Sequence, residues 1–168
     1  MVVKMKAIIP ADPAVLKIGK VRLEVLNTMR KMGTQVRRDF AKTTDTWKNK
    51  PRFEQSVSLK APGPTLTVWT DNLIYFFLND GTKEHPISAK NAPVLAFKTS
   101  FFPKTFPGVI GSVRGGSFAP WGHAKEVIHP GTEPREWAET IKDKWQPKFT
   151  VAMDAAIKKA VKAYGQAI

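Results

Sequence analysis

The stretch Lys125-Glu-Val-Ile-His-Pro-Gly-Thr-Glu-Pro-Arg-Glu-Trp137 leads from an extended apolar pair through a turn into the start of a helix. Pro130 and Gly131 end the strand, because proline has no N–H to donate and glycine tolerates backbone angles that other residues avoid. Thr132 can accept hydrogen bonds from the first N–H groups of a helix, and Pro134 suits its first position. The pattern therefore predicts a strand-turn-helix corner.

A shorter upstream segment, Asn79-Asp-Gly-Thr-Lys-Glu-His-Pro86, contains the same Gly-Thr and His-Pro elements in a different order. We expect the two glycines to act through backbone geometry, the two threonines to be local caps, and each histidine to bond a backbone carbonyl. Two such corners predict a fixed rim of turns. The residues assigned to the corners, the last two of them as anchors, are Gly81, Thr82, His85, His129, Gly131, Thr132, Arg135 and Trp137.

The two corners, in this order and separated by residues 87–97, resemble the tail-completion or neck (head-tail joining) proteins of long-tailed double-stranded DNA phages, of the lambda minor tail protein Z type. The match covers roughly residues 71–149, and the flanking helices match only by type. The resemblance implies an α+β domain with a long N-terminal helix, a small, mostly antiparallel sheet, a long aromatic and glycine-rich loop, and a C-terminal helix or kinked helix pair. It also implies a structural virion protein of the neck or tail end, which forms a ring that completes the tail and joins it to the head connector.

The expected partners follow from the same resemblance. They are other copies of the chain in a ring, a hexamer by analogy with tail symmetry, and adjacent neck proteins such as the connector or adaptor, the tail terminator or the tail tube. Non-specific contact with genomic DNA is also considered, and no membrane partner is expected. The expected location is the virion neck or tail, with the host cytoplasm before assembly. The main alternative is a stand-alone basic nucleic-acid-binding protein, although no helix-turn-helix, RNA-recognition or zinc-finger motif is visible.

Length and charge constrain the function classes. A chain of 168 residues fits one domain, and the absence of cysteine excludes disulfides and thiolate metal sites. The first ten residues are too short and too interrupted for a signal peptide, and no later segment approaches a membrane span. The net charge is +13, and residues 1–60 hold 14 Lys and Arg against 5 Asp and Glu. An excess of positive charge attracts phosphates or an acidic protein surface. The alternative is that it marks only the solvated face of a helix.

The single domain of residues 1–168 is divided into a basic helix (8–50), strands with the first corner (51–99), an extended arm (100–124), and the second corner with C-terminal helices (125–168). Asp12 and Pro13 are typical of a helix start, and the helical pattern reaches about Thr46. Gly33 is a position where a kink or a break can occur. The apolar stripe of this helix is Ile18, Val21, Val25, Met29, Met32, Val36 and Phe40. The basic face, for DNA or an acidic partner, is Lys17, Lys20, Arg30, Lys31, Arg37 and Arg38.

Alternating patterns predict a hairpin of residues 53–60 and 65–70, and a third strand at 93–99. The apolar run 73–78 is too short for periodicity to assign, and the resemblance implies a short helical turn there. Helices are predicted for residues 135–145 and 148–164, with Pro147 either kinking one helix or separating two. The second helix has an apolar stripe of Phe149, Met153, Ala156, Ile157, Ala160, Val161 and Tyr164.

Residues 100–124 are rich in glycine, proline and aromatic side chains. A loop of that length inside a small domain is uncommon without a partner, so we expect it to contact another chain. The alternative is an Ω-loop folded over its own domain. The aromatic residues assigned to a subunit or partner interface are Phe101, Phe102, Phe106, Phe118 and Trp121.

The sequence gives little support for catalysis. His85, His123 and His129 lack the spacing of a metal site, and the chain has neither a phosphate-binding Gly-Lys-Ser/Thr loop nor a nucleophile elbow. Asp80 and Glu133 lie in predicted turns, where a local hydrogen bond is the ordinary role of a carboxylate. We therefore expect a non-enzymatic protein without a cofactor or a metal.

Overall fold

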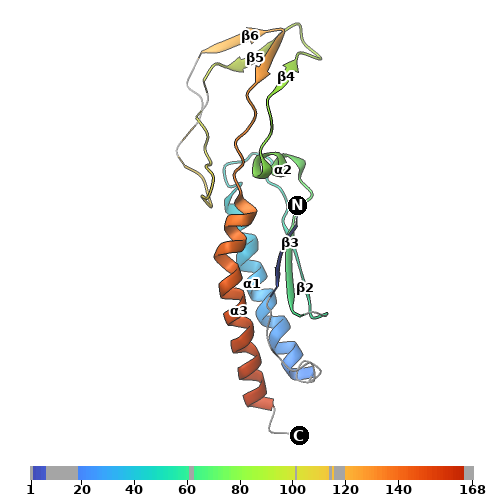
Figure 1. The fold of residues 1–168 in the computed structure, drawn as a ribbon. Coiled ribbons are helices and arrows are strands. Elements are labelled where there is room, and N and C mark those ends of the chain that lie inside the picture. Colours follow the sequence, from blue (N-terminus) through green and yellow to red (C-terminus); the bar gives the residue numbers. More distant parts are fainter. Residues whose placement is uncertain are drawn as a thin grey trace.

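The computed structural model describes residues 2–6, 19–60, 63–100, 102–113, 115 and 120–164, and it has the expected α+β architecture. A body of two long helices and a three-stranded sheet continues into a projecting arm of two short β-ribbons (Figure 1). The elements, in chain order, are β1 (Val2–Lys6), α1 (Gly19–Lys42), β2 (Glu54–Ser58), β3 (Thr65–Trp69), α2 (Leu73–Asp80), β4 (His85–Ser88), β5 (Leu95–Lys98), β6 (Trp121–Ala124), β7 (Glu126–His129) and α3 (Trp137–Tyr164).

The body has two layers. The helices α1 and α3 run antiparallel along each other, since the beginning of α1 and the end of α3 lie at the same end of the molecule (Figure 1). They pack on an antiparallel sheet with the strand order β1-β3-β2, in which α3 contacts β1 and α1 contacts β2 and β3. Alternation along β3 turns Leu66 and Val68 into the core, because successive side chains of a strand point to opposite faces. The hydrophobic core therefore lies between the helices and the sheet.

Helix α1 forms around the predicted stripe, whose members from Val21 to Phe40 are all buried. The helix ends at Lys42, a turn earlier than predicted, and the expected start at Asp12 and Pro13 lies outside the described residues, as do Lys17 and Ile18. Gly33 does not break it. A Cβ there would lie 2.9 Å from Leu66 Cδ1, so the glycine lets α1 approach β3 closely.

The sheet contains the predicted hairpin and one strand that was not predicted. Strands β2 and β3 pair with Glu54 opposite Trp69, as expected for residues 53–60 and 65–70. Strand β1 pairs with the other side of β3, and its Met5 is fully buried opposite Leu66. This strand has only five residues, too few for its alternation to be distinguished from an irregular segment in the sequence.

Helix α2 has the helical form that the resemblance implies for residues 73–78. Its N-cap is Asn72, whose side chain accepts a hydrogen bond of 2.9 Å from the Tyr75 N–H. The buried Tyr75 ring packs 5.1 Å from Phe53 and 5.2 Å from Trp137, measured between ring centroids. The aromatic group ties α2 to both long helices and to the start of β2.

The arm consists of two antiparallel ribbons, β4 with β7 and β5 with β6. Residues 121–124 were expected to belong to an extended loop, and instead form β6 against the predicted third strand. Residues 102–113 return to the body: Gly108 N–H donates to Arg135 O, Ser112 Oγ donates to Asp45 Oδ2, and Ile110 packs against the core. This part of the chain thus takes the Ω-like course that the sequence left open (Figure 1).

Helix α3 is one continuous helix with Pro147 inside it, rather than two helices. Pro147 cannot donate to the carbonyl one turn earlier, and the packing on α1 tolerates that loss. The predicted stripe is buried from Phe149 to Ala160, whereas Val161 is 37% exposed and the Tyr164 side chain lies outside the described part. Of the helices described, none is long and apolar enough to cross a membrane.

Candidate functional site

The two corner segments lie against each other where the arm joins the body. Thr82 N–H donates to Thr132 O at 2.9 Å and Thr132 N–H donates to Thr82 O at 3.0 Å, which forms an isolated antiparallel bridge. Gly81 and Gly131 have φ angles of 75° and 89°. A Cβ on Gly81 would lie 2.7 Å from Thr132 O, and one on Gly131 would overlap Thr82 O. We call these four residues the corner clamp.

The structure corrects the role expected for Thr132 and adds a contact between the two corner histidines. Thr132 does not cap α3, because the helix begins only at Trp137, five residues later, and its first-turn Ala138 N–H donates to Asn79 Oδ1. Pro134 is correspondingly outside the helix. His85 and His129 form a cross-strand pair with rings stacked at 5.1 Å. His85 Nδ1 lies 2.8 Å from Lys83 O, as expected for a carbonyl partner, whereas His129 Nδ1 accepts from the Gly131 N–H at 3.0 Å.

Asn79 performs the capping role that was assigned to the threonines. Its Oδ1 accepts a hydrogen bond of 3.0 Å from the Ala138 N–H in the first turn of α3, and its backbone carbonyl accepts from Arg135 and Glu136. The end of α2 therefore holds the start of α3. The fold brings Asn79 next to a helix that begins more than fifty residues later in the sequence. No local sequence pattern could therefore predict this cap.

The two predicted anchors are buried. Arg135 is 5% exposed and its guanidinium lies 3.2 Å from Glu133 Oε2 on the surface. Trp137 is fully buried beside Tyr75. Asp80, considered for acid-base chemistry, is the last residue of α2 and accepts a hydrogen bond from the Asn79 side chain at 2.6 Å. Asp80 and the Arg135 guanidinium therefore have structural partners, whereas Thr82 Oγ1, Arg135 Nε and Trp137 Nε1 are buried and have no hydrogen-bond partner among the described residues.

Asp39 is a buried polar centre that the sequence analysis missed. It is 3% exposed and accepts hydrogen bonds from Lys144 Nζ (2.6 Å), Trp145 Nε1 (2.8 Å) and Lys42 Nζ (3.3 Å). Burial acts to raise the pKa of its carboxyl, but the three donors, led by Lys144, outweigh burial and hold that pKa below its ordinary value. The sequence feature that could have indicated a buried carboxylate is the position of Asp39 next to the apolar stripe of α1, between Val36 and Phe40.

Two sets of exposed large apolar side chains include aromatic residues. The first, the α2 patch, consists of Leu73 (65% exposed), Ile74 and Phe77 (56%). The second set, which we call the arm surface, comes from three segments: Phe102 in the loop that follows β5, Trp121 (59%) in β6 and Ile128 in β7. Of the predicted interface aromatics, Phe106 is half-buried with its ring 5.8 Å from that of Phe102, and Phe101 and Phe118 lie outside the described residues.

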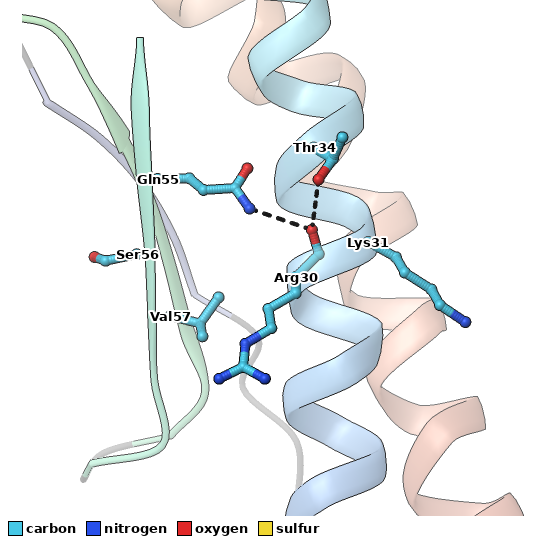
Figure 2. Close-up of a pocket in the computed structure, with 6 residues that line it drawn as sticks. All are labelled: Arg30, Lys31, Thr34, Gln55, Ser56 and Val57. Carbon is cyan, nitrogen blue, oxygen red and sulfur yellow. Dashed lines mark hydrogen bonds between the residues drawn. The ribbon is translucent and has the colours of Figure 1, made fainter.

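The predicted basic face is divided between two sides of α1. Figure 2 shows Arg30 extending towards β2, while Lys31 extends to the other side of the helix. Arg37 and Arg38 follow seven residues later and repeat this division, because seven residues make almost two turns. Lys20, Arg30, Lys31, Arg37 and Arg38 are all exposed. The structure therefore replaces one basic face with two.

A shallow depression lies between α1 and β2. Its rim includes Arg30, Thr34, Gln55 and Val57, and both Thr34 Oγ1 and Gln55 Nε2 donate to Arg30 O (Figure 2). Lys31 and Ser56 also border it but point away, whereas Arg30 extends on the side of β2, near Val57 (Figure 2). This arrangement does not assemble an acid, a base and a nucleophile.

Within the described part of the chain there is no group of three histidine, cysteine or acidic residues that could hold a metal ion. Comparison with protein-family models, with curated proteins and with solved structures found no match to this chain.

Proposed function

We propose that this chain is a structural protein of the neck or tail end of a long-tailed phage, where copies form a ring that completes the tail and joins it to the head connector. The resemblance of the two corner segments suggests the family. The observation that carries the proposal is the presence of two different exposed apolar surfaces on one molecule, the α2 patch and the arm surface. Exposed apolar patches with aromatic residues mark protein contacts.

A ring needs such a pair of surfaces. Copies related by rotation meet through two different faces, so that each subunit offers one face to its left neighbour and another to its right. We propose that the arm surface of one copy lies on the α2 patch of the next. Their charges differ in sign, since Asp71 and Asp80 flank the α2 patch, whereas the arm carries Lys98, Lys104 and Lys125 against Glu84 and Glu126. Such complementarity sets orientation and association rate.

A stand-alone nucleic-acid-binding protein is the second candidate. It is favoured by the net charge of +13 and by the exposed cations of α1. This candidate would bind DNA as a monomer or dimer, with a sequence preference that persists at physiological salt.

Mass measurement of the full chain, alone and with purified connector and tail-tube proteins, tests the ring. We expect a concentration-dependent oligomer or a defined complex. Phe77→Ser and Trp121→Ser should each abolish it, because each removes a large apolar contact. Val151→Ser is the matched control, since Val151 is 69% exposed on α3 and belongs to neither surface. A monomer at every concentration, with no complex and with sequence-specific DNA binding, would reject the proposal in favour of the second candidate.

A further inference from the structure

The outer side of the helix pair, facing away from the sheet, carries cations from both helices. Gly33 faces Leu66 of β3, and Lys31, two residues earlier, lies about 200° around the helix, on the opposite side. Arg38 follows Lys31 by seven residues and Lys42 follows Arg38 by four, so both return to nearly the same side. These three residues form the α1 row of this outer side.

Two ion pairs show that lysines of α3 lie beside the α1 row. Lys144 reaches Asp39 at 2.6 Å, and fifteen residues further along the antiparallel helix Lys159 reaches Glu24 at 2.8 Å. Lys148 lies one turn after Lys144, and both ammonium groups approach the Trp145 ring, at 5.1 and 5.6 Å from its centroid. Helix α3 therefore adds its own lysines beside those of α1. We call the combined set the outer basic stripe: Lys31, Arg38, Lys42, Lys144, Lys148 and Lys159.

The stripe keeps a positive charge after its internal pairing. The carboxylates that pair with it are Asp39, which is buried and already accepts three hydrogen bonds, and Glu24. The pKa of Glu24 is lowered first by its hydrogen bond to Lys159 and also by the charge of Lys31, which indicates that both helices contribute to one local field. The ammonium groups remain accessible, since the Lys42 and Lys159 side chains are 64% and 75% exposed.

We propose that the outer basic stripe binds the phosphate backbone of double-stranded DNA without reading its sequence. From Lys144 to Lys159 the stripe extends for about 22 Å along α3, at 1.5 Å per residue, and DNA presents phosphates continuously over such a length. Lys148 also borders a shallow, open depression lined by Pro147, Val151, Ala152 and Ala155. The stripe itself is made of flexible, solvated cations, which suit phosphate contacts that do not depend on sequence. The ring is not required for this inference, because the stripe belongs to one subunit.

The test uses the purified full chain and a fluorescently labelled DNA duplex of random sequence, with anisotropy measured across a salt series. We expect the logarithm of the binding constant to fall linearly with the logarithm of salt concentration, by about 0.9 for each phosphate contacted. Arg38→Glu/Lys148→Glu should weaken binding by at least about tenfold and reduce the slope by about 2. The matched control is Arg30→Glu/Arg37→Glu, which makes the same change in net charge on the other side of α1 and should weaken binding much less.

Melting curves check that both double variants keep the wild-type fold, and Arg38→Gln/Lys148→Gln provides a milder version. An intermediate loss of affinity in the milder variant supports a direct phosphate contact. Equal losses in the stripe variant and the control would overturn the proposal, because net charge alone would then explain binding. Tighter binding of polyglutamate than of DNA would also overturn it and would assign the stripe to an acidic protein partner.

Discussion

Gly131→Ala should destabilise the protein far more than an ordinary glycine substitution. The first contribution is conformational, since a residue with a side chain at a φ of 89° is strained by roughly 1 kcal/mol or more. The second is steric, because the new Cβ would overlap the Thr82 carbonyl oxygen. Relieving that overlap separates the two threonines, and each of their hydrogen bonds contributes about 1 kcal/mol. The expected loss is therefore about 3 kcal/mol.

Gly108→Ala provides the matched control. Gly108 has a φ of 72°, but a Cβ there would meet no atom within 4 Å, so only the conformational cost of about 1 kcal/mol remains. Thermal melts should place Gly131→Ala about 6–12 °C below wild type and Gly108→Ala about 2–4 °C below it, at 2–4 °C per kcal/mol for a domain of this size. Hydrogen exchange should be accelerated at Thr82 and Thr132 in the first variant only. Equal melting temperatures for the two variants would refute the reasoning, because the corner clamp would then contribute nothing beyond local backbone strain.

Two further predictions concern the buried polar contacts. Asp39→Asn should cost about 2 kcal/mol at neutral pH, because it weakens charge-assisted hydrogen bonds to Lys144 and Lys42. Since the folded-state pKa of Asp39 is lowered, this stabilisation is present above the ordinary value of 3.8 and is lost as pH falls through the folded-state pKa. Urea titrations at several pH values should therefore show the difference in unfolding free energy between wild type and Asp39→Asn becoming smaller in that range. A difference that stays constant with pH would contradict the prediction. Asn79→Ala should cost about 1–2 kcal/mol by removing the α3 cap, comparable to Asn72→Ala at α2, and faster hydrogen exchange at the Ala138 amide would identify the lost bond.

The features that the sequence predicted are those specified by neighbouring residues. The α1 stripe recurs at helical spacing, and the β2–β3 hairpin alternates with a period of two, so both were visible in short windows. The glycines at 81 and 131 were also identifiable, because few other residues adopt a positive φ. The bridge between Thr82 and Thr132 was not identifiable from the sequence, since fifty residues separate the two.

The predictions that were wrong concern features decided by contacts between residues far apart in the sequence. Thr132 has the chemistry of an N-cap, but pairing with Thr82 keeps the chain at Thr132 extended, the helix begins five residues later, and Asn79 supplies the cap from α2. Arg30 and Lys31 are adjacent in sequence, but about 100° of helix rotation separates their side chains. The packing of α1 on the sheet places Arg30 on the side of β2 and Lys31 on the other side of the helix. Charge composition could identify a basic helix but not its two faces.

The base of the arm bears on how the proposed ring would assemble. The Thr82–Thr132 bridge and the Asn79 cap join the end of α2, the first strand of the arm and the start of α3 within a few residues. Any rotation of the arm against the body must therefore break hydrogen bonds that are buried or partly buried, each contributing about 1 kcal/mol. An arm fixed in this way presents Phe102 and Trp121 at a defined position before a neighbour arrives. Binding then costs less ordering entropy, which favours a ring built from pre-formed subunits over one whose arms fold on contact.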